Sequence, residues 1–377
     1  MILLSAVLIN DLRSGGAERV VSNLINQSDN SIMLIQIWPK QFYSIYSDKS
    51  FFLLDKKGIL IVDIIKATYL LIRLVKKKEI GVINSHLFWA NYINIISSIV
   101  SGQKTVLTHC VSFVSKFKNA RLSRLIHFFL GTVLFRFGDK HIFKSLDMKS
   151  EYESIFKLQN GVVIYNPINI SVVLRLSTAQ PEFKFDLSKK YLLCVGRFHK
   201  TKNQSILIDA LNELPSQYEI IFLGEGEMLY SCKEKALKLN LSKRTHFLGN
   251  CNNPFPFYRN ADLYISVSQS EGFPNALIEA IALKCFPIVF DCPTGPREIL
   301  SSTYQSHPVQ TSRGFDIYGL GILLKDYSSH TIASAILSDY LVSNSFIDFQ
   351  RSNFLSSVES QYIFELYMFN LKKNLEV

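Results

Sequence analysis

Apolar residues in the first half of the chain alternate between short continuous runs and longer amphipathic segments. The continuous runs are ILLSAVLIN at 2–10, SIMLIQIW at 31–38, GVINSH at 81–86 and KTVLTH at 104–109, which is typical of buried strands. Residues 16–28 and 61–80 instead repeat apolar residues at the helical period, and the second ends in lysines that suit a helix carboxyl end. This alternation predicts a parallel sheet with helices on both faces.

The same pattern restarts at residue 191. Strand-like runs lie at 191–196, 218–224, 245–249, 262–268 and 286–291, with helical segments at 203–214, 227–240, 253–261 and 274–284. The polar segment STAQPEFKFDLSKK before them is typical of a linker. We therefore predict a first domain at 1–175, a linker at 176–190, a second domain at 191–345 and carboxyl-terminal helices at 346–377, packed back on the first domain.

The predicted fold class is α/β, with two Rossmann-like, doubly wound domains facing a central cleft. A length of 377 residues agrees with two domains. In such domains the carboxyl ends of strands and the amino ends of helices meet at one edge, where ligands bind. Candidate chemistry is therefore sought directly after strands.

The basic excess lies entirely in the first half. Residues 1–180 hold 22 Lys and Arg against 11 Asp and Glu, whereas the remainder holds 19 against 20. This asymmetry indicates that the first half meets an anionic surface. Segment 112–129 places four basic residues among Phe and Leu, which suits an anionic membrane surface: Lys116, Lys118, Arg121 and Arg124. A helix packed on its domain with solvated basic side chains is the alternative.

Several classes of protein are disfavoured. The most apolar stretch, 125–137, contains His127 and Arg136 and is too short to span a bilayer, and the amino terminus reads as a strand instead of a signal peptide. The six cysteines form no C-x-x-C pair and no histidine cluster has ligand spacing, so we expect a cytosolic protein without a metal site. The neutral second half and the missing recognition motifs argue against nucleic acid as a partner.

Two glycine-containing loops of the second domain follow buried strands. In VGRFHKTKN (195–203), Gly196 permits a tight exit, and Arg197, Lys200 and Lys202 bring three cations to one loop, where they suit phosphate oxygens. In LGEGE (223–227), Gly224 lets the backbone approach a ligand. A solvated basic loop and an ordinary strand-to-helix turn are the alternatives for these two segments.

The segment SEGFPNALIEA (270–280) carries two acids around a predicted helix start at Pro274. Backbone N–H groups at the start of a helix can bind a diphosphate, and here they would come from Asn275, Ala276 and Leu277. Glu279 lies four residues after Asn275 and could accept from ribose hydroxyls, while Glu271 could reach a second sugar. The spacing fits a nucleotide sugar laid across the helix end; acids that merely suit a helix amino end are the alternative.

In the first domain, GGAER (15–19) follows the first strand. Gly15 and Gly16 would form a loop whose N–H groups can close on a phosphate or an acceptor, unless the loop is only a flexible turn. His86 and His109 each end a strand, and strand-end position favours His109 as a site residue.

These motifs, together with HFLGN, CPTGPREIL and GLGILL, occur in the order found in retaining glycosyltransferases of family 4, and the chain resembles that family and its GT-B fold over about 300 residues. One departure is Asn203, where the family commonly has Gly. The resemblance implies a cytoplasmic enzyme, attached peripherally to the inner face of the membrane, that takes a hexose or N-acetylhexosamine from a nucleotide diphosphate sugar. The implied acceptor is a lipid-linked saccharide in bacterial surface-polysaccharide or O-antigen assembly.

By the same resemblance, Arg197 and Lys202 would neutralise the leaving diphosphate, Glu279 would hold the ribose and Glu271 the donor sugar. His109 would approach that sugar from the first domain. No metal or other cofactor is implied, and the chain has no Asp-x-Asp motif. Two alternatives stay open: a metal-free sugar-nucleotide epimerase of the same fold, and a non-catalytic nucleotide-sugar-binding protein.

Overall fold

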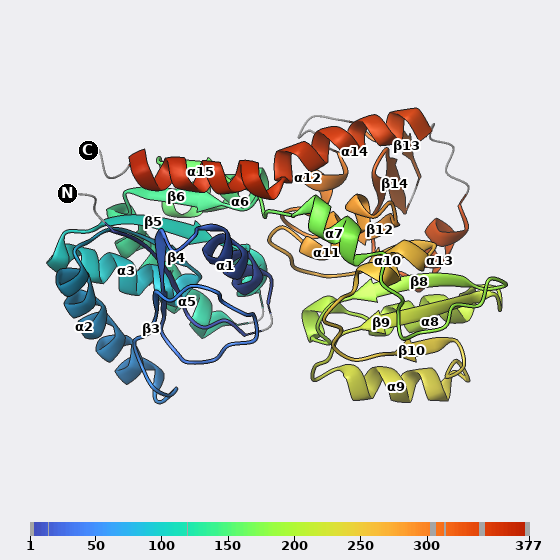
Figure 1. Ribbon diagram of the computed structural model, residues 1–377. Coiled ribbons are helices and arrows are strands. Elements are labelled where there is room, and N and C mark those ends of the chain that lie inside the picture. The colour runs from blue at the N-terminus through green and yellow to red at the C-terminus, as the bar shows by residue number, and fades with distance from the viewer. Residues whose placement is uncertain are drawn as a thin grey trace. The chain divides into compact units, whose positions relative to one another are not determined.

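A computed structural model describes residues 4–13, 15–118, 120–301, 307–312, 314–338 and 344–373 (Figure 1). The chain divides into two compact units. The first comprises Met1–Pro167 and Gln361–Val377, and the second comprises Ile168–Ser360.

The described part of the first unit contains one fully parallel sheet, with strand order β3-β2-β1-β4-β5-β6-β7. Its strands are β1 (Leu4–Ile9), β2 (Ile32–Gln36), β3 (Ser50–Phe52), β4 (Ile80–His86), β5 (Lys104–His109), β6 (Lys140–Phe143) and β7 (Gly161–Val163). The helices are α1 (Gly16–Gln27), α2 (Leu60–Lys78), α3 (Phe88–Ser101), α4 (Phe113–Lys116), α5 (Arg121–Leu134), the 3-10 turn η1 (Phe135–Phe137), α6 (Leu146–Phe156) and α15 (Ser360–Lys373).

Alternate strand residues divide the core of this unit into two layers. Val7 and Ile9 point to the face that α1 covers, and the buried residues of α15 join the same cluster: Ile363, Tyr367 and Leu371. Ala6 and Leu8 point to the opposite face, which α2 and α3 cover. Towards β6, side chains of α3, η1 and α6 continue that second layer. A helix from the end of the chain therefore completes the core of the amino-terminal unit.

The second unit contains a larger sheet, with strand order β10-β9-β8-β11-β12-β15-β14-β13 in the described residues. Its parallel strands are β8 (Lys190–Val195), β9 (Tyr218–Leu223), β10 (Thr245–Phe247), β11 (Leu263–Ser266), β12 (Phe286–Phe290) and β15 (Gly321–Leu324). The last two strands, β14 (Phe315–Tyr318) and the edge strand β13 (Gln310–Thr311), are joined by antiparallel pairing. The helices are α7 (Ile170–Leu176), α8 (Ser205–Glu213), α9 (Leu229–Lys238), α10 (Phe255–Asn260), α11 (Asn275–Ala282), α12 (Pro296–Leu300), α13 (Ser329–Leu337) and α14 (Asn344–Val358), with the 3-10 turn η2 (Lys200–Lys202).

The boundaries of the units differ from those expected from the sequence. The chain first passes from one unit to the other after Pro167, so α7 and the whole predicted linker at 176–190 belong to the second unit. The physical reason lies in two aromatic residues of that segment: the Phe183 ring lies 4.8 Å from His246 and the Phe185 ring 4.9 Å from Tyr191, centroid to centroid. At the other end, α14 belongs to the second unit and α15 to the first.

We predict that the α15 contact stabilises the first unit specifically. Replacing Ile363, which is buried against the sheet, by Ala should lower the free energy of unfolding of that unit by about 2–5 kcal/mol. Trp38 and Trp89, the two tryptophans of the chain, both lie in this unit, so tryptophan fluorescence during urea denaturation follows it. Tyr362→Ala, an exposed position on the same helix, should change that energy by less than about 0.5 kcal/mol. Equal effects of the two substitutions would contradict the assignment.

Candidate active site

The order of the second sheet fixes where a ligand site can form. Successive crossovers run outward from β8 to β9 and β10 in one direction, and from β11 to β12 in the other. Crevices form at the carboxyl ends of the two strands where the winding reverses. The loops that follow β8 and β11 therefore flank this position, and both were singled out from the sequence.

The loop after β8 is held in a close backbone approach. Gly224 has a φ of 141°, and a Cβ atom there would lie 2.2 Å from the carbonyl oxygen of Gly196, so only glycine fits. The buried Gln204 donates through Nε2 to the carbonyl oxygen of Arg197 at 2.9 Å. Gln204 thus fixes the backbone that carries Arg197, whose side chain is exposed.

The loop then turns through η2 and places Lys202 opposite the loop after β11. Asn203 ends this turn with a φ of 54°, in the left-handed region that glycine and asparagine tolerate, which explains how Asn replaces the family's common Gly. The N–H of Gln269 donates to the carbonyl oxygen of Thr201 at 2.7 Å and ties the two loops together. Across this tie, Lys202 Nζ lies 2.5 Å from Glu271 Oε1.

The Lys202–Glu271 pair is partly exposed, with side-chain exposures of 30% and 14%. The pair spans the reversal point of the sheet, since one member follows β8 and the other follows β11. Thr294 Oγ1 donates to the Glu271 carbonyl oxygen at 2.7 Å and so fixes the backbone of the acid. Both side chains of the pair are thus partly accessible to water.

Helix α11 starts at Asn275, with Pro274 as its N-cap residue, one position later than the sequence indicated. Asn275 and Ala276 are half-buried in its first turn. The N–H of Leu277 donates to the carbonyl oxygen of Pro274 at 3.1 Å, and the Leu277 side chain is buried. In this structure the Leu277 N–H is thus used inside the first turn of the helix, unlike the role expected of it.

Glu279 lies on the inner face of α11 and is 3% exposed. Tyr258 donates its hydroxyl to Glu279 Oε2 at 3.2 Å. Burial and the charge of Glu279 raise the pKa of Tyr258 well above its ordinary value, so the phenol stays protonated and can keep donating. The Glu279 carboxylate is therefore more deeply buried than that of Glu271.

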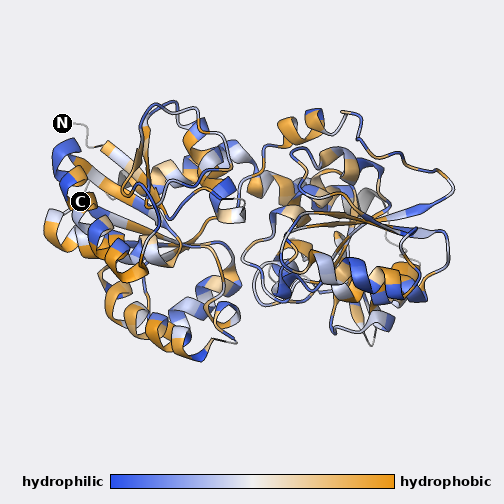
Figure 2. Cartoon of the chain, turned by 90° about the horizontal axis from the view of Figure 1, so that it is seen from below, coloured by the Kyte–Doolittle hydropathy of each residue, from blue (hydrophilic) through white to orange (hydrophobic). Residues whose placement is uncertain are grey.

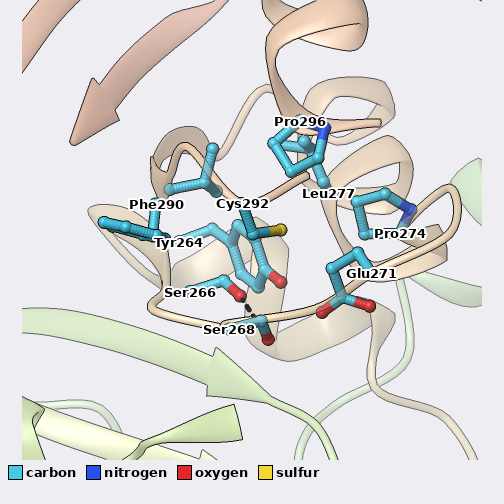
Figure 3. Close-up of a pocket in the computed structure, with 10 residues that line it drawn as sticks. Tyr264, Ser266, Ser268, Glu271, Pro274, Leu277, Phe290, Cys292 and Pro296 are labelled. Atoms are coloured by element: carbon cyan, nitrogen blue, oxygen red, sulfur yellow. Dashed lines mark hydrogen bonds between the residues drawn. The ribbon is translucent and has the colours of Figure 1, made fainter. Parts of the chain in front are cut away.

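A small pocket opens beside Glu271 and the start of α11 (Figure 3). Ser266 and Ser268 contribute hydroxyls 3.4 Å apart on the side where the Glu271 carboxylate also lies, while Leu277 and Pro296 form an apolar side. Cys292 also lines the pocket, and burial raises the pKa of its thiol, which stays protonated at neutral pH. These serines and this cysteine were missed by sequence reasoning; the alternating serines of ISVSQSEG, at the end of a strand, were the available signal.

The glycine candidates of the first unit lie at the corresponding edge of its own sheet, where the winding reverses between β1 and β4. Gly15 is the N-cap residue of α1 and Gly16 its first residue. Tyr43 donates its hydroxyl to the carbonyl oxygen of Gly15 at 3.2 Å, which anchors the loop.

His109 departs from the role expected of it. It is 2% exposed, its Nε2 lies 3.0 Å from His141 Nδ1, and its ring packs among Phe135, Phe143 and Tyr152. Burial lowers the pKa of His109 well below the ordinary histidine value. In this structure His109 is a neutral core residue, because its side chain points to the packed face of the sheet. Its position at the end of a strand had suggested contact with a bound sugar instead.

Three further observations concern the described residues only. All six cysteines are free thiols. No group of three or more His, Cys, Asp or Glu side chains is arranged to hold a metal ion. None of the helices has the length and apolar composition needed to cross a membrane.

Comparison with known proteins identifies the family of the second unit. The family described as glycosyl transferases group 1 matches residues 177–336, which lie in the second unit. The second unit is a group 1 glycosyltransferase domain. The residues that carried the resemblance in this unit all fall within the matched range, from VGRFHKTKN to GLGILL.

Relatives of this glycosyltransferase extend the match beyond the second unit. The N-acetylgalactosamine-N,N'-diacetylbacillosaminyl-diphospho-undecaprenol 4-alpha-N-acetylgalactosaminyltransferase of Campylobacter jejuni is 26% identical over 332 residues, 85% of this chain and 90% of that enzyme. The capsular polysaccharide biosynthesis glycosyltransferase CapH of Staphylococcus aureus is 28% identical over 248 residues, 62% of this chain and 67% of that protein.

Solved structures confirm the predicted fold class of the glycosyltransferase. HepE of Anabaena, crystallised with UDP and glucose, superimposes with a TM-score of 0.73 at 15% identity, covering 98% of this chain and 100% of HepE. The GT-B class, with two Rossmann-like units in one chain, is thus established for this glycosyltransferase.

The buried histidines of the first unit predict acid sensitivity. Burial lowers the pKa of His141 to about 4 from 6.5, so between these values the unfolded chain binds a proton that the native unit does not. The free energy of unfolding should therefore fall as pH falls through this window, by about 1.4 kcal/mol per pH unit for this histidine. Urea denaturation followed by tryptophan fluorescence measures the slope, and His141→Gln should reduce it. A variant with the wild-type slope would rule out His141 as a source.

Proposed function

We propose that this glycosyltransferase moves a hexose or N-acetylhexosamine from a nucleotide diphosphate sugar to a lipid-linked saccharide, with retention of configuration, in the assembly of a cell-surface polysaccharide. The Lys202–Glu271 pair carries the proposal, since a cation and an acid meet where the sheet reverses and a helix begins. The names of two relatives support the setting, one a capsule enzyme and the other specifying a diphospho-undecaprenol-linked saccharide.

In this proposal the diphosphate lies between the cationic loop and the start of α11. Arg197 and Lys202 supply positive charge from one side, and the amide-rich first turn at Asn275 and Ala276 supplies the helix dipole from the other. Charge develops on the diphosphate as it departs, so these groups bind the transition state more strongly than the bound donor. They supply the stabilisation that other enzymes obtain from a metal ion, and no cofactor is invoked.

The two acids hold the two sugars of the donor. Glu271 leaves Lys202 for hydroxyls of the transferred sugar, while the diphosphate takes its place beside the lysine. Glu279 accepts from ribose hydroxyls, with its carboxylate oriented by Tyr258. Gly196 and Gly224 keep the loop backbone close enough for the donor to approach, and Gly15 and Gly16 offer backbone N–H groups on the first unit.

Retention follows from attack on the face that the diphosphate leaves. The bond between the anomeric carbon and the phosphate oxygen breaks as a bond to the acceptor oxygen forms. The proton of the acceptor hydroxyl passes to the departing phosphate oxygen, so charge balances without a side chain as general base. This scheme agrees with the burial of His109 in the core. The acceptor would be reached from the cytoplasmic face of an anionic membrane.

Nucleotide binding tests the proposal directly. UDP or GDP, or one of their sugars, should raise the thermal midpoint of the second unit, and Lys202→Ala should lower transfer by about 100- to 1,000-fold with an unchanged circular dichroism spectrum. Lys190→Ala is the matched control, because this exposed lysine lies at the opposite, amino end of β8. Wild-type turnover in Lys202→Ala would remove the lysine from the mechanism, and product formed from donor and water alone would indicate an epimerase.

Transfer should also survive removal of divalent ions. Saturating EDTA is expected to leave the rate within about twofold of the untreated enzyme, because two cations and a helix dipole stabilise the leaving group. The rate is measured on the same preparation before and after dialysis against the chelator. Loss of transfer that only a divalent ion restores would contradict a leaving group stabilised by the protein alone.

A further inference from the structure

Helix α5 presents an unusual outer side to solvent. Its exposed side chains Leu122, Leu125, Ile126, Phe129 and Val133 recur at the helical period and form one stripe, with exposures between 36% and 73%. The opposite side of the same helix is also apolar, and it packs through His127 and Gly131 against the aromatic cluster of the unit. A helix that is apolar on both sides needs a second apolar environment on the outside.

The neighbouring helices continue this apolar surface. Within the first unit, α3 packs against both α2 and α5 over the same face of the sheet. Exposed apolar side chains lie on each: Ile96, Ile99 and Val100 on α3, and Ile61, Ile65 and Tyr69 on α2. Figure 2 shows helices of the unit that holds both chain ends coloured as hydrophobic over much of their length. We call the exposed residues of α2, α3, α4 and α5 the helical face.

The charge of the helical face has one sign. Its helices contain eight Lys and Arg, five on α2, one on α4 and two on α5, and a single acid, Asp63. Asp63 is buried and accepts from Trp38 Nε1 and from the N–H of Gly58, each at 2.8 Å, so it does not reach the surface. Lys116, Lys118, Arg121 and Arg124 are exposed, and in the described residues no carboxylate pairs with them.

We propose that the helical face docks the first unit reversibly onto an anionic lipid bilayer. The α5 stripe lies at the boundary between headgroups and acyl chains, and the basic residues contact the anionic headgroups. A second copy of this chain fits the face less well, because it would bring two strongly basic surfaces together. This inference rests on the proposed function and names the membrane partner through which a lipid-linked acceptor is reached.

Vesicle co-sedimentation of the full chain tests the proposal. The probes are vesicles of phosphatidylcholine alone and of an equimolar mixture of phosphatidylcholine and phosphatidylglycerol. Binding should be strong only to the anionic vesicles and should weaken as salt is added. Arg121→Gln with Arg124→Gln should weaken it about 25-fold, at about fivefold per lost charge, and Leu125→Ser with Phe129→Ser should weaken it at least as much.

The matched control lies in the second unit. Tyr230 and Leu237 on α9 are 73% and 68% exposed, so Tyr230→Ser with Leu237→Ser removes as much exposed apolar surface from another helix. This control should bind vesicles like the wild type. Binding that ignores lipid charge, or that the control weakens equally, overturns the proposal. So does a dimer in sedimentation velocity that Leu125→Ser with Phe129→Ser dissociates, because a second copy would then occupy the face.

Nucleotide binding in solution separates this inference from the proposed function. A chain that UDP or GDP stabilises but that ignores anionic vesicles would refute the docking face and leave the transferase proposal intact. A chain that binds the vesicles but no nucleotide would refute the proposed function alone. The α5 variants should keep the wild-type nucleotide-induced rise in thermal midpoint, which also shows that they are folded.

Discussion

The pairing of Lys202 with Glu271 depends on the reversal of winding between β8 and β11, and the chemistry proposed for the second unit depends on that pairing. Two loops far apart in the sequence come together only because their strands are neighbours with carboxyl ends on one edge. The backbone tie from Gln269 to Thr201 then sets their separation. The cation and the acid are thereby held in contact, and in the proposed mechanism the diphosphate separates them.

Most of the fold could be predicted from the sequence, because burial imposes a period on each element. The alternation of apolar runs and amphipathic segments marked both sheets, whereas the division into units depended on contacts that no local pattern encodes. Phe183 and Phe185 sit in a polar stretch that resembles a linker, yet their rings pack on the second unit. Likewise, the spacing of Ile363 and Tyr367 shows that α15 is amphipathic but not which sheet it covers.

The candidate site was predictable to the extent that its residues directly follow strands. Lys202 and Glu271 were found for this reason, and the structure brings them into contact. The same rule cannot tell whether His109 faces a crevice or the core, because successive strand side chains point to opposite faces, and in this structure His109 is buried. The use of the Leu277 N–H depends on the residue at which α11 begins, which the sequence pattern placed one position earlier. Ser266 and Ser268 were identified as candidate site residues only after the structure showed the pocket that they line.

The uneven charge of the chain suits the different partners proposed for its two units. In the second half, acids and bases nearly balance, so the proposed recognition of a diphosphate there would depend on the placement of Arg197 and Lys202 and not on a long-range field. The excess of basic residues belongs to the first half, where α2 and α5 carry much of it beside exposed apolar side chains. Salt screens such charges beyond about 10 Å, so they act on a surface that touches them. The two proposals thus assign separate electrostatic tasks to two units of similar architecture.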